Sequence, residues 1–168
     1  MHFRSATPDD IDKIMRIITQ GQEFIRSQGF IQWTNGYPEK ELLMQDIAHG
    51  NAHVLMQDGE MLSVAVVIIG DEPNYRHIYD GEWNSNDEYA TIHRMAVSAE
   101  HRGSGVAMVM FTQITDMCVN AGIRNIRADT HENNVPMRGA LERSGFICRG
   151  SVYMADGQKR VAYEKHID

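Results

Sequence analysis

The stretch "HRMAVSAEHRGSGVAMVMF", residues 93–111, joins two apolar segments through an arginine and two glycines. The first segment is typical of a strand, and the second continues with apolar side chains at helical spacing: Val106, Met110, Ile114 and Met117. Gly103 and Gly105 permit backbone torsions and a close approach that side chains obstruct. We therefore predict a strand, a glycine turn and a helix from about Gly103 to Ala121.

The glycine turn, "RGSGVA" at residues 102–107, has the properties of an anion seat. A helix that begins there leaves its first amide groups without intrahelical partners and carries partial positive charge at that end. Arg102 adds a charge beside it. A purely steric demand for small residues at a strand-to-helix turn explains the glycines as well. A P-loop is disfavoured because no Gly-Lys-Ser/Thr follows, and a dinucleotide-binding turn is weakened because Met108 replaces its third glycine.

Outward from this turn, strand and helix patterns alternate along the chain. Strands are predicted on both sides of an Asp58-Gly59 hairpin turn within residues 52–70, and over residues 2–7, 89–98, 123–130, 146–154 and 160–167. Besides the helix after the glycine turn, helices are predicted over residues 7–28, 39–49 and about 134–145. The pattern predicts one mixed α/β domain, residues 1–168, with a strand-helix-strand crossover at its centre.

Two irregular segments interrupt this order. Residues 29–38, "GFIQWTNGYP", form a loop with two large aromatic side chains, Trp33 and Tyr37. Residues 71–89, which include Trp83, are polar and aromatic, and a connection of this length is uncommon inside a compact domain. Such a segment often serves a site, but a plain surface loop has the same composition.

The composition is that of a globular protein of one domain. The 168 residues are 42% hydrophobic, and no apolar stretch approaches the roughly 20 residues that span a bilayer. The start "MHFRSATPDD" lacks the features of a secretory signal, so a cytoplasmic protein without a membrane partner is expected. Cys118 and Cys148 have neither metal-like nor redox-like spacing, and both are expected to be reduced core residues.

The charge of the chain argues against nucleic acid as a partner. The net charge is −7; the first 100 residues carry 7 basic and 16 acidic side chains, whereas the remainder carries 9 and 7. Binding to phosphates along a nucleic acid requires clustered positive charge, which an acidic chain lacks. The positive balance of the second part leaves room for one anionic ligand, and the acidic first part suits a cationic substrate.

The glycine turn and a second block downstream resemble the GNAT superfamily of acyl-CoA-dependent N-acetyltransferases. Residues 102–107 match its R-x-x-G-x-G/A signature, and residues 129–146, "DTHENNVPMRGALERSGF", are similar to the family's block of strand end, asparagine, helix and Gly-Phe. The order of elements also matches, so the resemblance covers nearly the entire chain. It implies a GNAT-like fold, with six to seven strands in a mixed sheet flanked by about four helices.

The resemblance implies acetyl-CoA as the acyl donor and indicates which residues would bind it. The amides of the turn would hold the pyrophosphate, and the main chain of the preceding strand would pair with the pantetheine arm. Residues of the second block would contact the same molecule. The cofactor-binding residues implied in this way are Met95, Ala96, Val97, Arg102, Gly103, Ser104, Gly105, Val106, Ala107, Asn134, Met137 and Arg138.

The expected reaction is transfer to a primary amine of a small molecule or peptide, by direct attack in a ternary complex. An alkylamine has a pKa of about 10.4 and is protonated at neutral pH, so a base and an oxyanion donor are needed, but no metal. By family position the donor is the amide of Met95, and His93 on the same strand is the expected base. Leu141 stands where many members carry a tyrosine that protonates the thiolate. Either Tyr153 or Tyr163 replaces that tyrosine, or the thiolate leaves unassisted.

The acceptor is expected to contact Trp33, Tyr37 and Trp83 in the irregular segments. Two other function classes stay open at this point. One is a non-catalytic acyl-CoA-binding sensor, which is favoured because Leu141 stands in place of the family's tyrosine. The other is a dinucleotide-dependent reductase. The sequence also leaves open the identity of the acceptor and whether the chain forms a homodimer.

Overall fold

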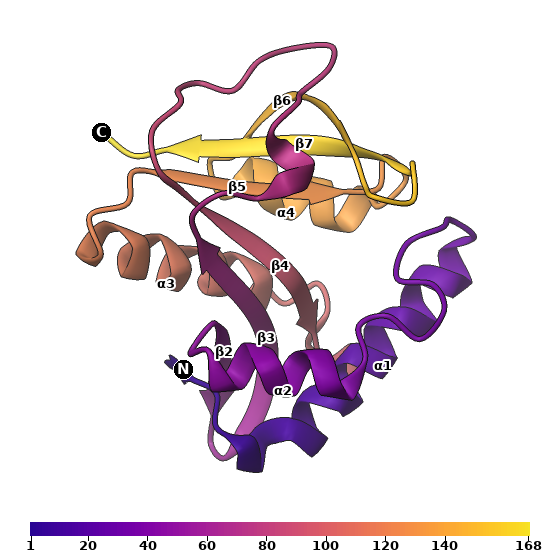
Figure 1. The fold of residues 1–168 in the computed structure, drawn as a ribbon. Coiled ribbons are helices and arrows are strands. Elements are labelled where there is room, and N and C mark those ends of the chain that lie inside the picture. The colour runs from indigo at the N-terminus through magenta and orange to yellow at the C-terminus, as the bar shows by residue number, and fades with distance from the viewer. The chain divides into compact units, whose positions relative to one another are not determined.

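Seven strands and four α-helices make up the fold, which is a computed structural model of residues 1–168 (Figure 1). The strands are β1 (His2–Ser5), β2 (Ala52–Gln57), β3 (Glu60–Ile69), β4 (Tyr89–Val97), β5 (Asn125–Thr130), β6 (Ile147–Tyr153) and β7 (Lys159–His166). The helices are α1 (Ile11–Gln28), α2 (Lys40–Ala48), α3 (Val106–Asn120) and α4 (Val135–Arg143), with 3₁₀ turns η1 (Pro8–Asp10), η2 (Pro73–Tyr75) and η3 (Ala99–His101). The strand order is β1-β2-β3-β4-β5-β7-β6.

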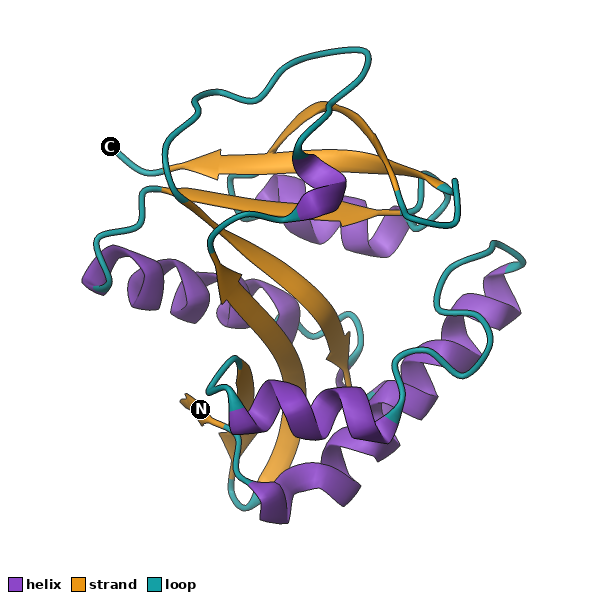
Figure 2. Ribbon diagram, in the orientation of Figure 1, coloured by secondary structure: helices purple, strands orange, loops and turns teal.

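The predicted mixed α/β fold is confirmed, with strands and helices within a few residues of their expected places (Figure 2). The sheet contains antiparallel pairs and one parallel pair, β4 with β5. None of the helices has both the length and the apolar character required to span a bilayer.

Segments far apart in the sequence assemble into two units. Unit 1 comprises Met1–Val67 and His93–Met110, and unit 2 comprises Ile68–Ile92 and Phe111–Asp168. Strand β4 and helix α3 each contribute residues to both units. Each unit buries its own apolar side chains, among them Leu43 and Val64 in the first and Ile126 in the second.

In unit 1, β1, β2 and β3 pair in antiparallel order. The hairpin between β2 and β3 turns at Asp58 and Gly59, whose φ values of 51° and 82° are those that an Asp-Gly pair favours. Helix α2 packs against β2 and against α1 (Figure 1).

Helix α1 buries one face and ends at a glycine. Its buried side chains, which recur at spacings of three and four residues, are Ile14, Ile17, Ile18 and Ile25. Gly29 follows with a left-handed φ of 77°, a common way for a helix to end. The predicted start at residue 7 is wrong in detail, because Pro8–Asp10 form the 3₁₀ turn η1 and α1 begins at Ile11.

One carboxylate fixes the entry into this helix. Asp10 accepts a hydrogen bond from the Thr7 amide at 2.8 Å, and from both terminal nitrogens of Arg4 at 2.7 and 2.9 Å. The Arg4 hydrogen bond, opposed by burial, lowers the pKa of Asp10 to about 2. A bidentate ion pair therefore joins β1 to the start of α1.

In unit 2, β5, β7 and β6 pair in antiparallel order, and the first residues of β4 join β5 in parallel. Helix α4 packs against β6. The helix begins after Asn134, whose side chain accepts a hydrogen bond from the Met137 amide at 3.3 Å, and it is followed by Gly145 with a φ of 87°. These are the predicted start and end of that helix.

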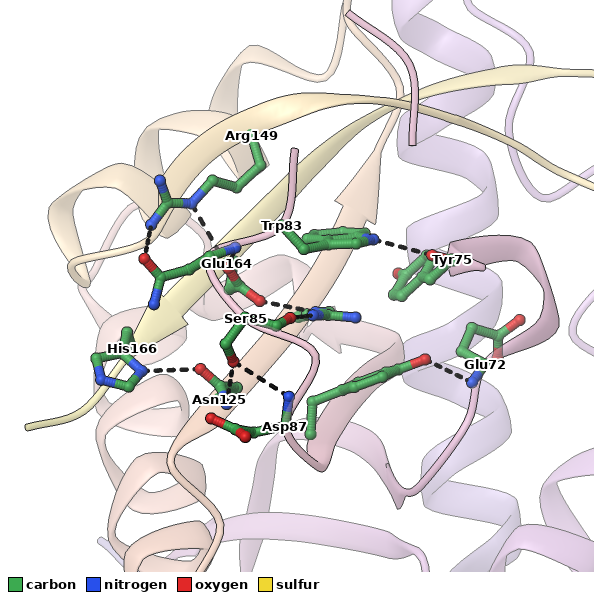
Figure 3. Close-up of polar contacts among 12 residues, drawn as sticks. Glu72, Tyr75, Trp83, Ser85, Asp87, Asn125, Arg149, Glu164 and His166 are labelled. Carbon is green, nitrogen blue, oxygen red and sulfur yellow. Dashed lines mark hydrogen bonds and ion pairs between the residues drawn. The ribbon is translucent and has the colours of Figure 1, made fainter. Parts of the chain in front are cut away.

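The long connection between β3 and β4 is fastened to β5 and β7 (Figure 3). Arg127 of β5 donates to Glu164 of β7 at 2.7 Å and to the carbonyl of Ser85 at 2.8 Å. Glu164 is fully buried and also accepts the Asn84 amide at 2.6 Å. Since a buried charge is tolerated only when it is paired and hydrogen-bonded, this ion pair requires the connection to lie over it.

Aromatic rings complete this attachment. The Arg127 guanidinium lies over the rings of Trp83 and Tyr89, 4.2 and 3.9 Å from their centroids. The indole of Trp83 donates to the carbonyl of Tyr75 at 2.9 Å (Figure 3), and Tyr75 itself is buried. The segment is irregular, as predicted, but it carries its own anchoring cluster.

The two cysteines lie in different surroundings. Cys118 of α3 is buried, as expected, whereas Cys148 of β6 is exposed. The prediction for Cys148 is wrong because β6 is the last strand of the sheet and its first residues are open to solvent. The apolar character of "FIC" did not reveal that this strand is an edge strand.

Replacing Asp10 by asparagine is expected to lower the free energy of unfolding at pH 7 by about 1–2 kcal/mol, a value reduced here for the partial exposure of Arg4. The folded-state pKa of about 2 lies below the ordinary value of 3.8. The stabilisation is therefore complete above pH 4 and is lost as the pH falls through 2. Urea unfolding of both proteins from pH 7 to pH 2 should show the difference shrinking toward acid. An Asp12→Asn control, at an exposed carboxylate, should change little; an equal loss in both variants would contradict the assignment.

Candidate functional site

The predicted anion seat is an exposed turn between η3 and α3. Gly103 and Gly105 have φ values of 77° and 88°, a region that residues with side chains rarely adopt. A Cβ atom at either position would meet no other atom within 4 Å. The torsions therefore require the glycines, whereas crowding by neighbours does not explain them. The surface over this backbone is open.

The amides at the start of α3 face this open turn. The first hydrogen bonds of the helix run from the amides of Met108 and Val109 to the carbonyl of Gly105, at 3.1 and 3.2 Å. The amides of Val106 and Ala107 precede these bonds and can donate to an external acceptor. Together with the helix dipole, they form a site suited to a phosphate group.

The turn is held in place by α1. Gln20 accepts a hydrogen bond from the Ala99 amide at 2.9 Å, and its own carbonyl accepts one from Arg102 at 2.7 Å. The Arg102 guanidinium also lies over the ring of Phe24, 4.7 Å from its centroid, and burial lowers its pKa. Arg102 thus connects the turn to α1, and it also places a positive charge beside the turn.

The backbone of β4 is only partly used by its neighbour β5. Their parallel pairing covers Tyr89–Thr91 and Asn125–Arg127, although both strands continue further. Further along β4, Arg94 has a φ of 48°, which interrupts the regular alternation, and both Met95 and Ala96 are buried. Outside that short ladder, the pairing of Met95, Ala96 and Val97 with a strand-like ligand stays a prediction. On its other side, the Ala96 carbonyl accepts a hydrogen bond from Ser63 at 2.8 Å.

The loop after α1 lies against β4. An added Cβ on Gly21 of α1 would come within 3.0 Å of the Trp33 ring and 3.5 Å of Ala96. Gln22 donates to the carbonyl of Tyr37 at 2.9 Å, and the Tyr37 hydroxyl accepts a hydrogen bond from Arg94 at 3.0 Å. Trp33 and Tyr37, the residues predicted to contact the acceptor, thus lie close to β4. His93, on the same strand, is half-buried.

The predicted residues of unit 2 have clear structural partners. Asn134 is buried and caps α4, as described above, and Met137 is half-buried in the first turn of the helix. Arg138 donates to the hydroxyl of Tyr163 at 3.0 Å and to the carbonyl of Glu132 at 3.1 Å. These two hydrogen bonds fix the orientation of the Arg138 side chain.

The residues considered for protonating the thiolate differ in their surroundings. Leu141 is buried, so the position aligned with the family's tyrosine belongs to the apolar core. Tyr163 is also buried and donates to Glu142 at 2.8 Å. Tyr153 is 43% exposed and its ring meets that of Tyr79 edge-on, with centroids 5.2 Å apart. Of the two tyrosines, Tyr153 is the accessible one.

The predicted contact of Trp83 with the acceptor stays a prediction, and the structure shows what this side chain does within unit 2. Its ring covers Arg127 and its indole nitrogen holds the Tyr75 carbonyl, so it belongs to the anchoring cluster of unit 2. Sequence reasoning also missed Arg94 and its partner Asp46, a buried ion pair with distances of 2.8 and 2.9 Å. The available signal was an arginine inside an apolar strand, "IHRMAV", which rarely occurs without a buried partner.

Comparison with known proteins fits this geometry. The model of the acetyltransferase (GNAT) family matches residues 20–146. A GNAT-family acetyltransferase from Streptococcus agalactiae 2603 is 36% identical, with a TM-score of 0.90 over 99% of this chain and 95% of that one. A GNAT-family acetyltransferase from Listeria monocytogenes 4b F2365 is 19% identical, with a TM-score of 0.76 over 99% and 94%. None of the curated protein sequences matches.

The family model covers most of the chain, and the GNAT acetyltransferase from Streptococcus agalactiae matches it over nearly the full length of both proteins. A dinucleotide-dependent reductase is thereby excluded. The family implies acetyl-CoA as the acyl donor, in agreement with the open anion seat at the start of α3. The chain therefore belongs to the GNAT family of acetyltransferases.

Proposed function

We propose that this chain transfers the acetyl group of acetyl-CoA to a primary amine of a small molecule or peptide, by direct attack in a ternary complex. The observation that carries the proposal is the start of α3, where unbonded amides and two left-handed glycines face an open surface. Family membership supports the donor. The acidic balance of the first 100 residues supports an acceptor that arrives as a cation.

The residues present fit a diphosphate. Of the amides of residues 103–107, those of Val106 and Ala107 can donate to the diphosphate, whereas the Ser104 amide already donates to the carbonyl of His101. The helix dipole supplies positive potential at the same place. The main chain of Met95, Ala96 and Val97 offers strand-like pairing to an extended amide arm. In unit 2, Asn134, Met137 and Arg138 complete the proposed cofactor-binding set. Bound acetyl-CoA supplies a thioester carbonyl that is activated toward nucleophiles.

The chemistry proposed for the protein consists of three proton movements and one stabilising contact. The His93 imidazole accepts the first proton that the ammonium group of the acceptor must lose, directly or through a water. The Met95 amide donates a hydrogen bond where negative charge develops on the carbonyl oxygen. The Tyr153 hydroxyl, the accessible phenol of the pair considered, donates a proton to the sulfur as the carbon–sulfur bond breaks. The second proton that the nitrogen loses as the new carbon–nitrogen bond becomes an amide restores this phenol through water. Trp33 and Tyr37 line the acceptor side.

A non-catalytic acyl-CoA-binding module remains the second candidate, because the buried Leu141 replaces the tyrosine of many members. Both candidates share the anion seat, so binding alone does not separate them. Free thiol should be followed while the protein is incubated with acetyl-CoA and a panel of primary amines, and calorimetry should measure CoA affinity in parallel. Turnover supports the enzyme; CoA binding without any turnover supports the module.

Replacing Gly105 by valine is expected to raise the dissociation constant for CoA by about ten-fold or more, since about 1.4 kcal/mol of lost binding gives that factor. The side chain would project over the turn and also oppose the left-handed torsion. Calorimetry measures the effect. Gly59→Val is the matched control, because Gly59 has a similar φ of 82° and equally open surroundings. A loss of CoA affinity in the control as large as in Gly105→Val would show that backbone strain alone is responsible.

Replacing His93 by glutamine is expected to lower kcat by about 100-fold, the range attributed to general base catalysis. CoA affinity should stay unchanged, because the proposed cradle consists of backbone groups. Steady-state kinetics and calorimetry together test this. His49→Gln, at an exposed position after α2, is the control. Unchanged turnover in the His93 variant would remove this residue from the mechanism.

A further inference from the structure

Arg94 lies in an unusual position for a charged residue. It is in the middle of β4, has a left-handed φ of 48°, and its side chain is only 9% exposed. Left-handed torsions are uncommon for residues with side chains and persist where the surroundings enforce them. The partners of the Arg94 guanidinium therefore indicate which contacts hold the strand in this conformation.

Those partners come from two different segments. Nε and Nη2 donate to the two carboxylate oxygens of Asp46 on α2, at 2.9 and 2.8 Å, and the Asp46 side chain is only 7% exposed. Nη1 donates to the hydroxyl of Tyr37 in the loop between α1 and α2, at 3.0 Å. Burial opposes the charge of Arg94, but the hydrogen bond to Asp46 and the contacts with Tyr37 raise its pKa above the ordinary value. One planar side chain thus joins the strand, the helix and the loop.

The contact with Tyr37 differs in kind from the one with Asp46. The ion pair with Asp46 is buried, and each of the two charges compensates the other. Tyr37 is 39% exposed, so water can also satisfy its hydroxyl. A phenol has one proton to donate and lone pairs to accept with. Because Arg94 donates to the phenol oxygen, the Tyr37 proton is directed to a different partner.

We propose that Arg94 is the positioning residue of the acceptor side: it fixes Tyr37 so that the phenol donates a hydrogen bond to an oxygen that the acceptor carries near its amine. This rests on the proposed function and narrows its substrate class to amines with a carbonyl or carboxylate close by. A lysine cannot replace Arg94, because an ammonium group lacks the planar fork that serves Asp46 and Tyr37 together. The adjacent residue, Met95, carries the proposed oxyanion donor, so the same arginine also borders the reacting groups.

Kinetics with Tyr37→Phe and Arg94→Lys test the proposal, using amines of matched length with and without a carbonyl oxygen, such as an amino-acid amide and an alkylamine. Both variants should raise KM for the amide by about ten-fold. The increase in KM should be clearly larger for the amide than for the alkylamine, and KM for acetyl-CoA should change less than KM for the amide. Tyr37→Phe alters an exposed hydroxyl, so it tests the proposal even if Arg94→Lys folds poorly. Equal effects on the two amines, or no effect on either, would overturn the proposal.

A matched control comes from Arg76, which forms an exposed ion pair with Asp71. Arg76→Lys makes the same chemical change as Arg94→Lys and should leave every kinetic constant unchanged.

Hydrogen exchange supplies a readout that does not depend on turnover. In Arg94→Lys, amides of residues 30–38 should exchange faster than in the unsubstituted chain, while those of β2 should not. Unchanged exchange in the loop overturns the positioning role. If the unsubstituted chain acetylates no amine, the proposed function fails, whereas the exchange rates still decide whether Arg94 holds the loop.

Discussion

The site depends on the part of strand β4 beyond its Tyr89–Thr91 ladder with β5, because main-chain groups can bind a ligand only where no neighbouring strand uses them. The later part of β4 carries the proposed base, the proposed oxyanion donor and the residues expected to pair with the cofactor arm. The same strand leads through η3 into the glycine turn. The proposed binding strand and the open turn therefore belong to one continuous piece of chain.

Each unit fastens its long irregular segment with one buried arginine. In unit 1, Arg94 pairs with Asp46 and reaches the loop that carries Tyr37. In unit 2, Arg127 pairs with Glu164 and reaches the carbonyl of Ser85. Burying such ion pairs is unfavourable unless every partner is satisfied, so the loops complete hydrogen-bond networks that the sheet alone leaves unfinished. The two networks attach the irregular segment of each unit to a strand without extending the regular structure.

The order of strands and helices was predictable because it rests on local patterns. Helical spacing, the Asp58-Gly59 pair and the glycine turn each act over a few neighbouring residues. The long-range pairs were not predictable in this way, since nothing near Arg94 in the sequence points to Asp46, 48 positions earlier. Trp83 shows the same limit, because the sequence of its polar segment does not reveal that the ring packs against the guanidinium of Arg127. At the candidate site, the turn and its torsions followed from the sequence, whereas the fixing of Tyr37 and Arg102 by other segments did not.

The unequal environments of the two sulfur atoms have a practical consequence. Burial raises the pKa of the Cys118 thiol to about 11, so little of its reactive thiolate exists near neutral pH. Cys148, by contrast, is exposed on the last strand of the sheet. A thiol-directed fluorophore or spin label should therefore attach to the native chain at a single position, which lies on β6 and away from the glycine turn in the sequence. The molecule offers a ready point for spectroscopic labelling without any prior substitution.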